Sequence, residues 1–149
     1  MSEDGTGTLN QEQLNRLVRH FNEEVEFARH IKLQIEEVEP GRAVLYTDVE
    51  TIHLNGSGSL HGRVYASVLD TGMGLSLASL VGLRVATTQM NVHFLGPVRE
   101  GRIVCRSEVI HSTRRTATVE GRAYDEEGKL VAMGTGAFRI FERKGSPIV

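Results

Sequence analysis

The chain has no tryptophan and a single cysteine, Cys105, among its 149 residues. One cysteine excludes an internal disulfide, and its place in the apolar run Ile103-Val104-Cys105 predicts a buried small side chain rather than a reactive thiol. Aromatic residues make up only 5% of the chain, so its core is expected to consist mainly of Val, Leu, Ile and Ala. A domain of this length buries about 70% of its unfolded surface and can fold without a disulfide.

A long apolar run and a strong net charge are also missing. No window approaches the roughly 18 apolar residues of a membrane-spanning helix. The N-terminus has neither the basic start nor the apolar stretch of a signal peptide. A net charge of −2 creates no field that would attract nucleic acid or an anionic membrane. We therefore expect a cytoplasmic protein that binds neither nucleic acid nor membrane.

The patterns that are present predict one α+β domain spanning residues 1–149. Apolar residues at helical spacing predict a helix from about 14 to 28, with a capping box at Thr8 and Gln11 and a break near Asn22. Extended segments are expected at about 31–38, 42–49, 84–95, 102–112, 115–125 and 129–141. Short turns join them, including Pro40-Gly41 and Gly96-Pro97, and favour antiparallel hairpins. Residues 1–7 are polar and are expected to be disordered.

A long segment without proline begins near Gly62 and is expected to form a helix. It contains Gly62, Gly72 and Gly74 together with many Ala and Ser residues. Each glycine inside a helix costs about 1 kcal/mol relative to alanine, so such a helix usually packs closely against other backbone. The composition therefore predicts a buried helix cradled by a sheet.

The start of this helix carries backbone groups that suit catalysis. The loop Gly56–Ser59 leads to Gly62, where the first N–H groups of the helix have no partner inside it. Together with the helix dipole, these donors suit a carbonyl oxygen that gains negative charge during acyl transfer. Asp70 lies further along the same helix among apolar and small residues, where a carboxylate is uncommon without a role.

Helix geometry separates these two features. Nine residues at about 100° each set His61 and Asp70 on roughly opposite sides of the helix. One helix therefore cannot readily aim both at the same point, whereas two copies related by a two-fold axis could. The spacing favours a dimer in which each site takes Asp70 from its neighbour.

The segment HLNGSGSLHGRVYASVLDTGMG resembles the signature of the phenylacetate-type (PaaI-like) hotdog acyl-CoA thioesterases, with Asn, His-Gly-Gly and Asp at matching spacings. The resemblance extends over most of the chain from about Phe27. It implies a hotdog fold, in which an antiparallel sheet wraps around a long central helix, with an N-terminal helix added. It also implies a thioester hydrolase that acts on acyl-CoA without a cofactor or metal, as a homodimer or a dimer of dimers.

The resemblance assigns roles to single residues. The backbone N–H of Gly62 would polarise the thioester carbonyl, and Asn55 and His61 of the same subunit would position the carbonyl, the water or the loop. The partner subunit's Asp70 would act as general base or nucleophile. Thr87 would match a Ser or Thr that orients the water or the carboxylate, with its neighbour Thr88 as an alternative.

One position departs from the family pattern, because the second glycine after the histidine is Arg63 here. Its side chain must turn away from the thioester, narrow the pocket or reach a phosphate of coenzyme A, a role that suits a guanidinium. Arg114 and Arg115, at a predicted hairpin turn, are further candidates for the nucleotide phosphates. A turn exposed to solvent is the alternative.

The same residues also have simpler structural interpretations. Asp70 could pair with a buried Ser or Arg, His61 could cap a loop and Asn55 could be a turn residue. The spacing of His53, His93 and His111 fits no zinc or iron site. The loop GSGSLHG lacks the third glycine of a dinucleotide site. The chain has no Gly-x-Ser-x-Gly, which argues against a serine hydrolase. A non-catalytic acyl-CoA-binding hotdog protein and a hotdog dehydratase are the alternatives to a thioesterase. The acyl carrier would be coenzyme A or acyl carrier protein.

Overall fold

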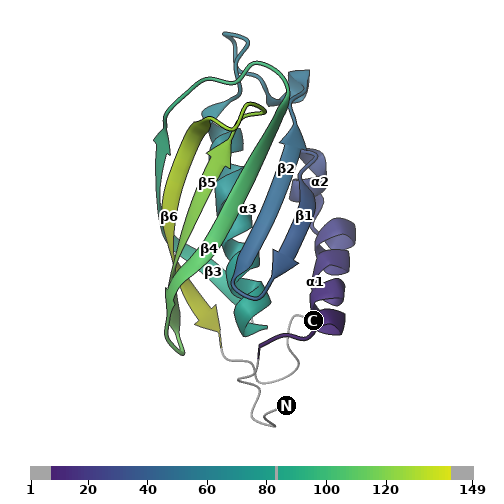
Figure 1. Cartoon of the computed structure of the whole chain (residues 1–149), viewed down its shortest axis with the longest axis vertical. Helices are drawn as coiled ribbons and strands as arrows, with labels where there is room; N and C mark the ends of the chain where they lie inside the picture. Colours follow the sequence, from purple (N-terminus) through teal and green to yellow (C-terminus); the bar gives the residue numbers. More distant parts are fainter. Residues whose placement is uncertain (1–7, 83, 142–149) are drawn as a thin grey trace.

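The computed structural model describes residues 8–82 and 84–141, and in them a six-stranded antiparallel sheet curls around one long helix (Figure 1). The helices are α1 (Gln11–Glu24), α2 (Glu26–His30), the short 3-10 helix η1 (Thr51–His53) and α3 (Gly62–Val81). The strands are β1 (Gln34–Glu39), β2 (Arg42–Asp48), β3 (Arg84–Phe94), β4 (Arg102–Ser112), β5 (Thr116–Tyr124) and β6 (Leu130–Phe141). This arrangement confirms the predicted hotdog fold. The disorder predicted for residues 1–7 lies outside the described residues.

The N-terminal helix begins and breaks at other residues than predicted. Its capping box is formed by Asn10 and Gln13, whose side chains each accept a hydrogen bond of 2.9 Å from the other's backbone N–H. The prediction of Thr8 and Gln11 was wrong by two residues. The break comes at Val25 rather than near Asn22, and the chain resumes as α2.

The first strand begins later than predicted. The two-residue period from Ile31 predicts a strand there, but the Ile31 N–H still bonds to Phe27 O at the end of α2. Lys32 then adopts a φ of 57°, and the strand begins only at Gln34. The predicted turn after this strand is present, with Gly41 at a φ of 83°.

The sheet order β1-β2-β4-β5-β6-β3 departs from a run of simple hairpins at one place. We expected the Gly96-Pro97 segment to join neighbouring strands. Instead, β3 pairs along its length with β6, and residues 95–101 carry the chain across the end of the sheet to β4. The prediction of a β3–β4 hairpin was wrong because local turn residues do not specify which strand becomes the neighbour.

Helix α3 forms the centre of the core. Val68, Leu69 and Met73 are fully buried against the sheet. A Cβ on Gly72 would lie 2.6 Å from Ser107 Oγ, so only glycine allows the sheet to approach here. Cys105 is buried beside this contact, as predicted, and burial raises the pKa of its thiol to about 11.

The length and composition of α3 contradict the expectation that no segment is apolar enough to cross a membrane. Among the described residues α3 is, by length and composition alone, apolar enough to cross a membrane, although no such stretch was expected from the sequence. Of that stretch, 56% is buried inside the fold, and a core helix passes the same test.

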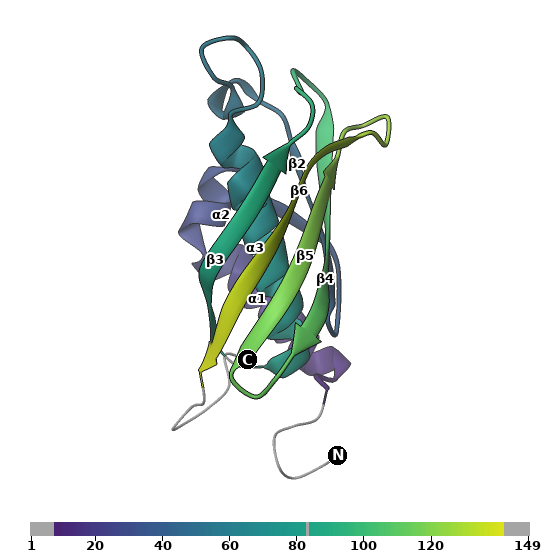
Figure 2. The same ribbon diagram turned by 90° about the vertical axis from the view of Figure 1, so that its left-hand side faces the viewer.

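The two edges of the sheet differ. Helix α1 packs against β1 at one edge (Figure 1), whereas β3 forms the other edge and pairs only with β6 among the described strands (Figure 2). Strand β3 is 11 residues long and mostly exposed. An exposed edge strand of this length presents a row of unpaired backbone groups that can accept another strand.

Candidate active site

The loop before α3 is organised by the side chain of Asn55. Its Oδ1 accepts hydrogen bonds from the N–H groups of Ser57 (2.9 Å) and Ser59 (3.2 Å), and its Nδ2 donates to Ser59 Oγ at 3.1 Å. The backbone N–H of Asn55 also donates to Ser59 O at 2.8 Å. Asn55 therefore closes the loop that delivers the chain to the start of α3, as the turn interpretation proposed.

The start of α3 leaves one backbone donor without an acceptor. His61 is the N-cap, and its Nδ1 accepts a hydrogen bond of 3.1 Å from the Arg63 N–H, while its carbonyl accepts from Val64 N–H at 2.9 Å. For the Gly62 N–H, residues 8–82 and 84–141 supply no acceptor. The first turn is thus capped at every position except the one to which the sequence assigned catalysis.

An exposed aromatic ring lies beside that donor. A Cβ placed on Gly62 would be 3.5 Å from the ring of Phe94, at the end of β3. The Phe94 ring meets Tyr65 edge to face with centroids 6.1 Å apart, and Tyr65 is fixed by a 2.8 Å hydrogen bond from its hydroxyl to Gly96 O. Phe94 is 57% exposed in the single chain. Gly62 therefore borders an exposed apolar ring that a substrate could cover.

Asp70 lies further along α3 and is bound to the edge strand. Its Oδ1 accepts a hydrogen bond of 2.6 Å from Thr87 Oγ1 on β3, and the carboxylate is half-buried. Thr88 instead donates to Ala137 O at 3.0 Å, at the bulge where the β3–β6 register shifts. The geometry thus brings Thr87, and not Thr88, to Asp70, while a Ser or Arg partner for Asp70 is not found among the described residues.

Within one chain Asp70 and Gly62 lie apart. They are separated by eight residues of a continuous helix, and a rise of 1.5 Å per residue gives about 12 Å along its axis. A carboxylate that attacks a thioester, or activates a water for the attack, must approach within about 3–3.5 Å of the reacting atoms. Asp70 and Gly62 of the same chain therefore do not form one site.

The candidate phosphate ligands are also divided between the two ends of the molecule. Arg63 is exposed beside the start of α3. Arg114 and Arg115 are exposed at the β4–β5 turn, which lies at the end of the sheet where α3 finishes (Figure 1). In a single chain these two arginines are therefore remote from Gly62.

Sequence reasoning missed the role of His53, which it weighed only as a metal ligand. The side chain is buried, its Nε2 lies 2.7 Å from Ile31 O, and its Nδ1 accepts from the Glu50 N–H at 2.9 Å. Its backbone carbonyl accepts from His61 N–H at 2.8 Å. His53 thus ties the end of α2 to the loop that carries the candidate site. Among the described residues, no three His, Cys, Asp or Glu side chains gather in a way that could hold a metal ion.

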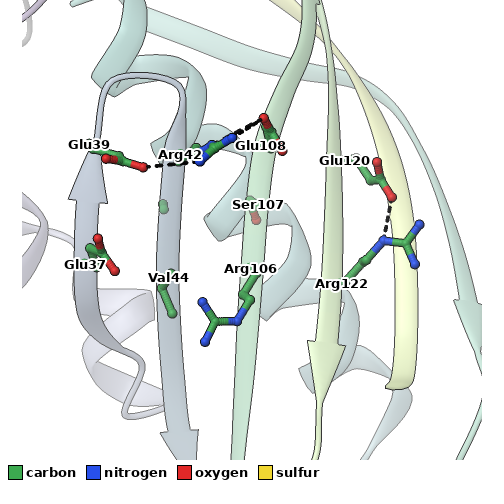
Figure 3. A pocket seen from close by; sticks show the side chains of 10 residues that line it. Glu37, Glu39, Arg42, Val44, Arg106, Ser107, Glu108, Glu120 and Arg122 are labelled. Carbon is green, nitrogen blue, oxygen red and sulfur yellow. Dashed lines mark hydrogen bonds and ion pairs between the residues drawn. The ribbon is translucent and has the colours of Figure 1, made fainter. Parts of the chain in front are cut away.

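A hollow lies elsewhere, on the outer face of the sheet (Figure 3). It has a volume of about 450 Å³ and is lined by side chains of β1, β2, β4 and β5, most of them charged. Neither Gly62 nor Asp70 borders it. We therefore do not assign the chemistry to this hollow.

Comparison with known proteins identifies the family. Residues 57–132, which include both Gly62 and Asp70, match the family model described as the thioesterase superfamily. The chain belongs to the thioesterase superfamily. It is a thioester hydrolase of the acyl-CoA thioesterase kind, as the resemblance predicted.

Curated relatives of this thioesterase agree with that assignment. A candidate esterase of Halobacterium salinarum is 34% identical over 106 residues, which cover 64% of this chain and 70% of that protein. Acyl-coenzyme A thioesterase 13 of Homo sapiens is 25% identical over 127 residues, 83% of this chain and 91% of that protein.

Solved structures show the same fold. The PaaI protein of Escherichia coli superposes with a TM-score of 0.84 at 22% identity, over 93% of this chain and 98% of that one. A hypothetical thioesterase of Streptococcus pneumoniae, solved with coenzyme A, gives a TM-score of 0.72 at 25% identity, over 76% of this chain and 88% of that one. The same protein has also been solved with an Asp→Ala and, separately, a Thr→Ala substitution.

Proposed function

We propose that this thioesterase hydrolyses acyl-CoA to free acid and CoA in a site shared between two subunits. Gly62 of one subunit would bind the thioester oxygen, and the partner subunit's Asp70 would supply the carboxylate. The observation that carries the proposal is the Gly62 N–H, a donor at the start of a 20-residue helix for which the described part of the chain offers no acceptor.

The chemistry follows from this donor and the carboxylate. As the thioester carbonyl is attacked, its oxygen gains negative charge, which the Gly62 N–H and the positive end of the α3 dipole stabilise. A donor of this kind contributes about 10²–10³ in rate. Asp70 would take a proton from the attacking water or attack the carbonyl carbon itself, and a general base contributes about 10²–10⁴. Thr87, hydrogen bonded to Asp70, would hold the carboxylate in the productive orientation.

A pairing of two β3 edges supports the shared site. In each chain Thr87 contacts Asp70, and Phe94 contacts Gly62. If two β3 strands pair antiparallel about a two-fold axis at Asn91, Thr87 of one chain lies opposite the partner's Phe94, because the bulge at Thr88 takes one residue out of the register. The same operation then brings each Asp70 toward the Gly62 of the other chain, and the exposed edge of β3 provides the backbone groups for the pairing.

The same two-fold axis would bring basic side chains of one chain toward the site that binds coenzyme A on the other. It exchanges the ends of the two chains, so the turn with Arg114 and Arg115 comes to the end at which the other chain's Gly62 lies. These guanidinium groups, with Arg63 of the Gly62 chain, would then be available to the phosphates of coenzyme A. The similarity to the S. pneumoniae protein solved with coenzyme A supports CoA as the carrier.

Asp70→Asn tests the proposed reaction. The substitution keeps the shape of the side chain and an oxygen that can accept from Thr87, but it removes the charge. We expect CoA release from acyl-CoA, measured with a thiol reagent, to fall about 10²–10⁴-fold while CoA binding and the unfolding temperature stay unchanged. Glu100→Gln, at an exposed loop carboxylate, is the control and should keep full turnover. Wild-type turnover by Asp70→Asn would rule out the proposed role.

A further inference from the structure

The buried ring of His53 meets a backbone group at each of its two nitrogens. Nε2 lies 2.7 Å from Ile31 O at the end of α2, and Nδ1 lies 2.9 Å from the Glu50 nitrogen. A carbonyl oxygen can only accept a hydrogen bond, and a backbone N–H can only donate one. The ring therefore carries its proton on Nε2 and leaves Nδ1 as an acceptor, so each nitrogen holds a different part of the chain.

The groups that hold this ring are themselves tied to the rest of the fold. Thr47, a buried residue of β2, donates to Ile31 O at 3.2 Å and to Lys32 O at 3.1 Å. The Lys32 ammonium pairs with the Glu50 carboxylate at 2.7 Å, and the His53 N–H donates to Glu50 O at 2.9 Å. Strand β2 and the end of α2 thus support the ring of His53 and, through it, the short helix η1.

The backbone of His53 connects this support to the start of α3. Its carbonyl oxygen accepts a 2.8 Å hydrogen bond from the His61 N–H, and beside it Leu54 and Leu60 form an antiparallel bridge. His61 directly precedes Gly62, and the peptide bond between them carries the Gly62 N–H. The direction of that N–H therefore depends on where the backbone of His61 is held, and His53 holds it.

We propose that His53 is a positioning residue that aims the Gly62 N–H at the thioester oxygen. The inference rests on the proposed function, since it needs the Gly62 N–H to bind that oxygen. Such a donor lowers the barrier only when it is already placed where negative charge develops, and a misplacement of about 1 Å costs about 100-fold in rate. Because this interaction strengthens in the transition state, loss of the ring should lower kcat and leave KM within about 2-fold of the wild type.

His53→Leu tests the inference, because leucine is similar in size but makes neither ring hydrogen bond. The substrate is the acyl-CoA that the wild type hydrolyses fastest in a panel of straight-chain and benzoyl thioesters, and a thiol reagent measures CoA release. We expect kcat to fall about 10–100-fold.

Ser79→Ala is the matched control, because it removes a buried hydroxyl near the other end of α3. That hydroxyl donates to Glu39 O at 2.9 Å and accepts from the Gly41 N–H at 3.1 Å. Its loss should lower the unfolding temperature but keep kcat within about 2-fold of the wild type. Thermal unfolding sets an assay temperature at which every variant is folded.

A Gly62→Pro background separates positioning from general support of the fold. This background has no N–H for His53 to aim, so adding His53→Leu should lower kcat by less than about 3-fold. His53→Asn is a milder second variant, because it keeps an acceptor for the Glu50 N–H and gives up only the contact with Ile31 O. Its kcat should fall at least about 3-fold in the wild-type chain and not in Gly62→Pro.

The outcomes distinguish this inference from the proposed function. Equal losses of kcat in both backgrounds, or wild-type kcat in the His53 variants, would overturn the positioning role and leave the proposed function standing. A fall in kcat matched by an equal rise in KM would also overturn it. Wild-type kcat in Gly62→Pro alone would overturn the proposed function, and the positioning role with it.

Discussion

Replacing Gly62 with proline removes a single hydrogen-bond donor and leaves the rest of the helix start in place. Gly62 is the first residue of α3, a position at which proline is well tolerated because its missing N–H has no partner in the helix. The residue before proline must be extended, and His61 already has a φ of −64° and a ψ of 136°. The new Cβ would lie 3.5 Å from the Phe94 ring, an ordinary contact.

The magnitude follows from what is lost. No acceptor for this N–H exists in the described fold, so we expect the free energy of unfolding to change by less than about 1 kcal/mol. The lost donor should instead lower kcat by about 10²–10³, or about 3–4 kcal/mol of transition-state stabilisation. Urea unfolding measures the free energy of unfolding, and steady-state kinetics with an acyl-CoA and a thiol reagent measure kcat.

Gly62→Ala is the matched control, because it adds the same Cβ and keeps the N–H. We expect Gly62→Ala to retain kcat within about 5-fold, since the contact with Phe94 is an ordinary one. Equal losses of kcat in the two variants would assign the effect to the Cβ. A proline variant with wild-type kcat would refute the reasoning that the Gly62 N–H binds the thioester oxygen.

Two further substitutions test the groups around this donor. Thr87→Val removes the 2.6 Å hydrogen bond to Asp70 and should lower kcat about 10-fold with little change in KM. The Thr88 hydroxyl bonds Ala137 O instead, so Thr88→Val should keep kcat within about 2-fold of the wild type. A larger loss of kcat in Thr88→Val than in Thr87→Val would contradict the assignment. His53→Ala removes a fully buried ring, leaves the Glu50 N–H without its acceptor and leaves the Ile31 carbonyl with the Thr47 hydroxyl alone, so it should lower the free energy of unfolding in urea by about 2–4 kcal/mol. His111→Ala, at an exposed histidine of β4, is the comparison and should change it by less than about 0.5 kcal/mol.

Local patterns predicted the elements of the fold well and their pairing less well. The glycines and small residues from Gly62 onward predicted a buried helix, and the structure confirms it. The neighbour of β3 could not be predicted, because the turn residues Gly96-Pro97 fix a local bend and not the strand that lies beside it. The two-residue alternation at Ile31 was misleading for a similar reason, since hydrogen bonding to Phe27 extends α2 there.

The candidate site was predictable only in its parts. The positions of Asn55, Gly62 and Asp70 followed from the motif, and helix geometry alone separated Asp70 from the start of the helix. The choice between Thr87 and Thr88 required the β-bulge, which shifts the register and is not evident in the sequence. The role of His53 depended on the Ile31 carbonyl, 22 residues away, and no local pattern identifies such a long-range contact.

The central claim is that one active site takes Gly62 from one subunit and Asp70 from the other. Mixing Gly62→Pro subunits with Asp70→Asn subunits after reversible unfolding tests it most directly. Neither parent should be active alone, but random pairing makes half of the dimers mixed, and each mixed dimer holds one intact site of its two. The account predicts about a quarter of wild-type activity in an equal mixture. Mixtures that contain mixed dimers by native mass spectrometry and yet stay as inactive as their parents would contradict a shared site.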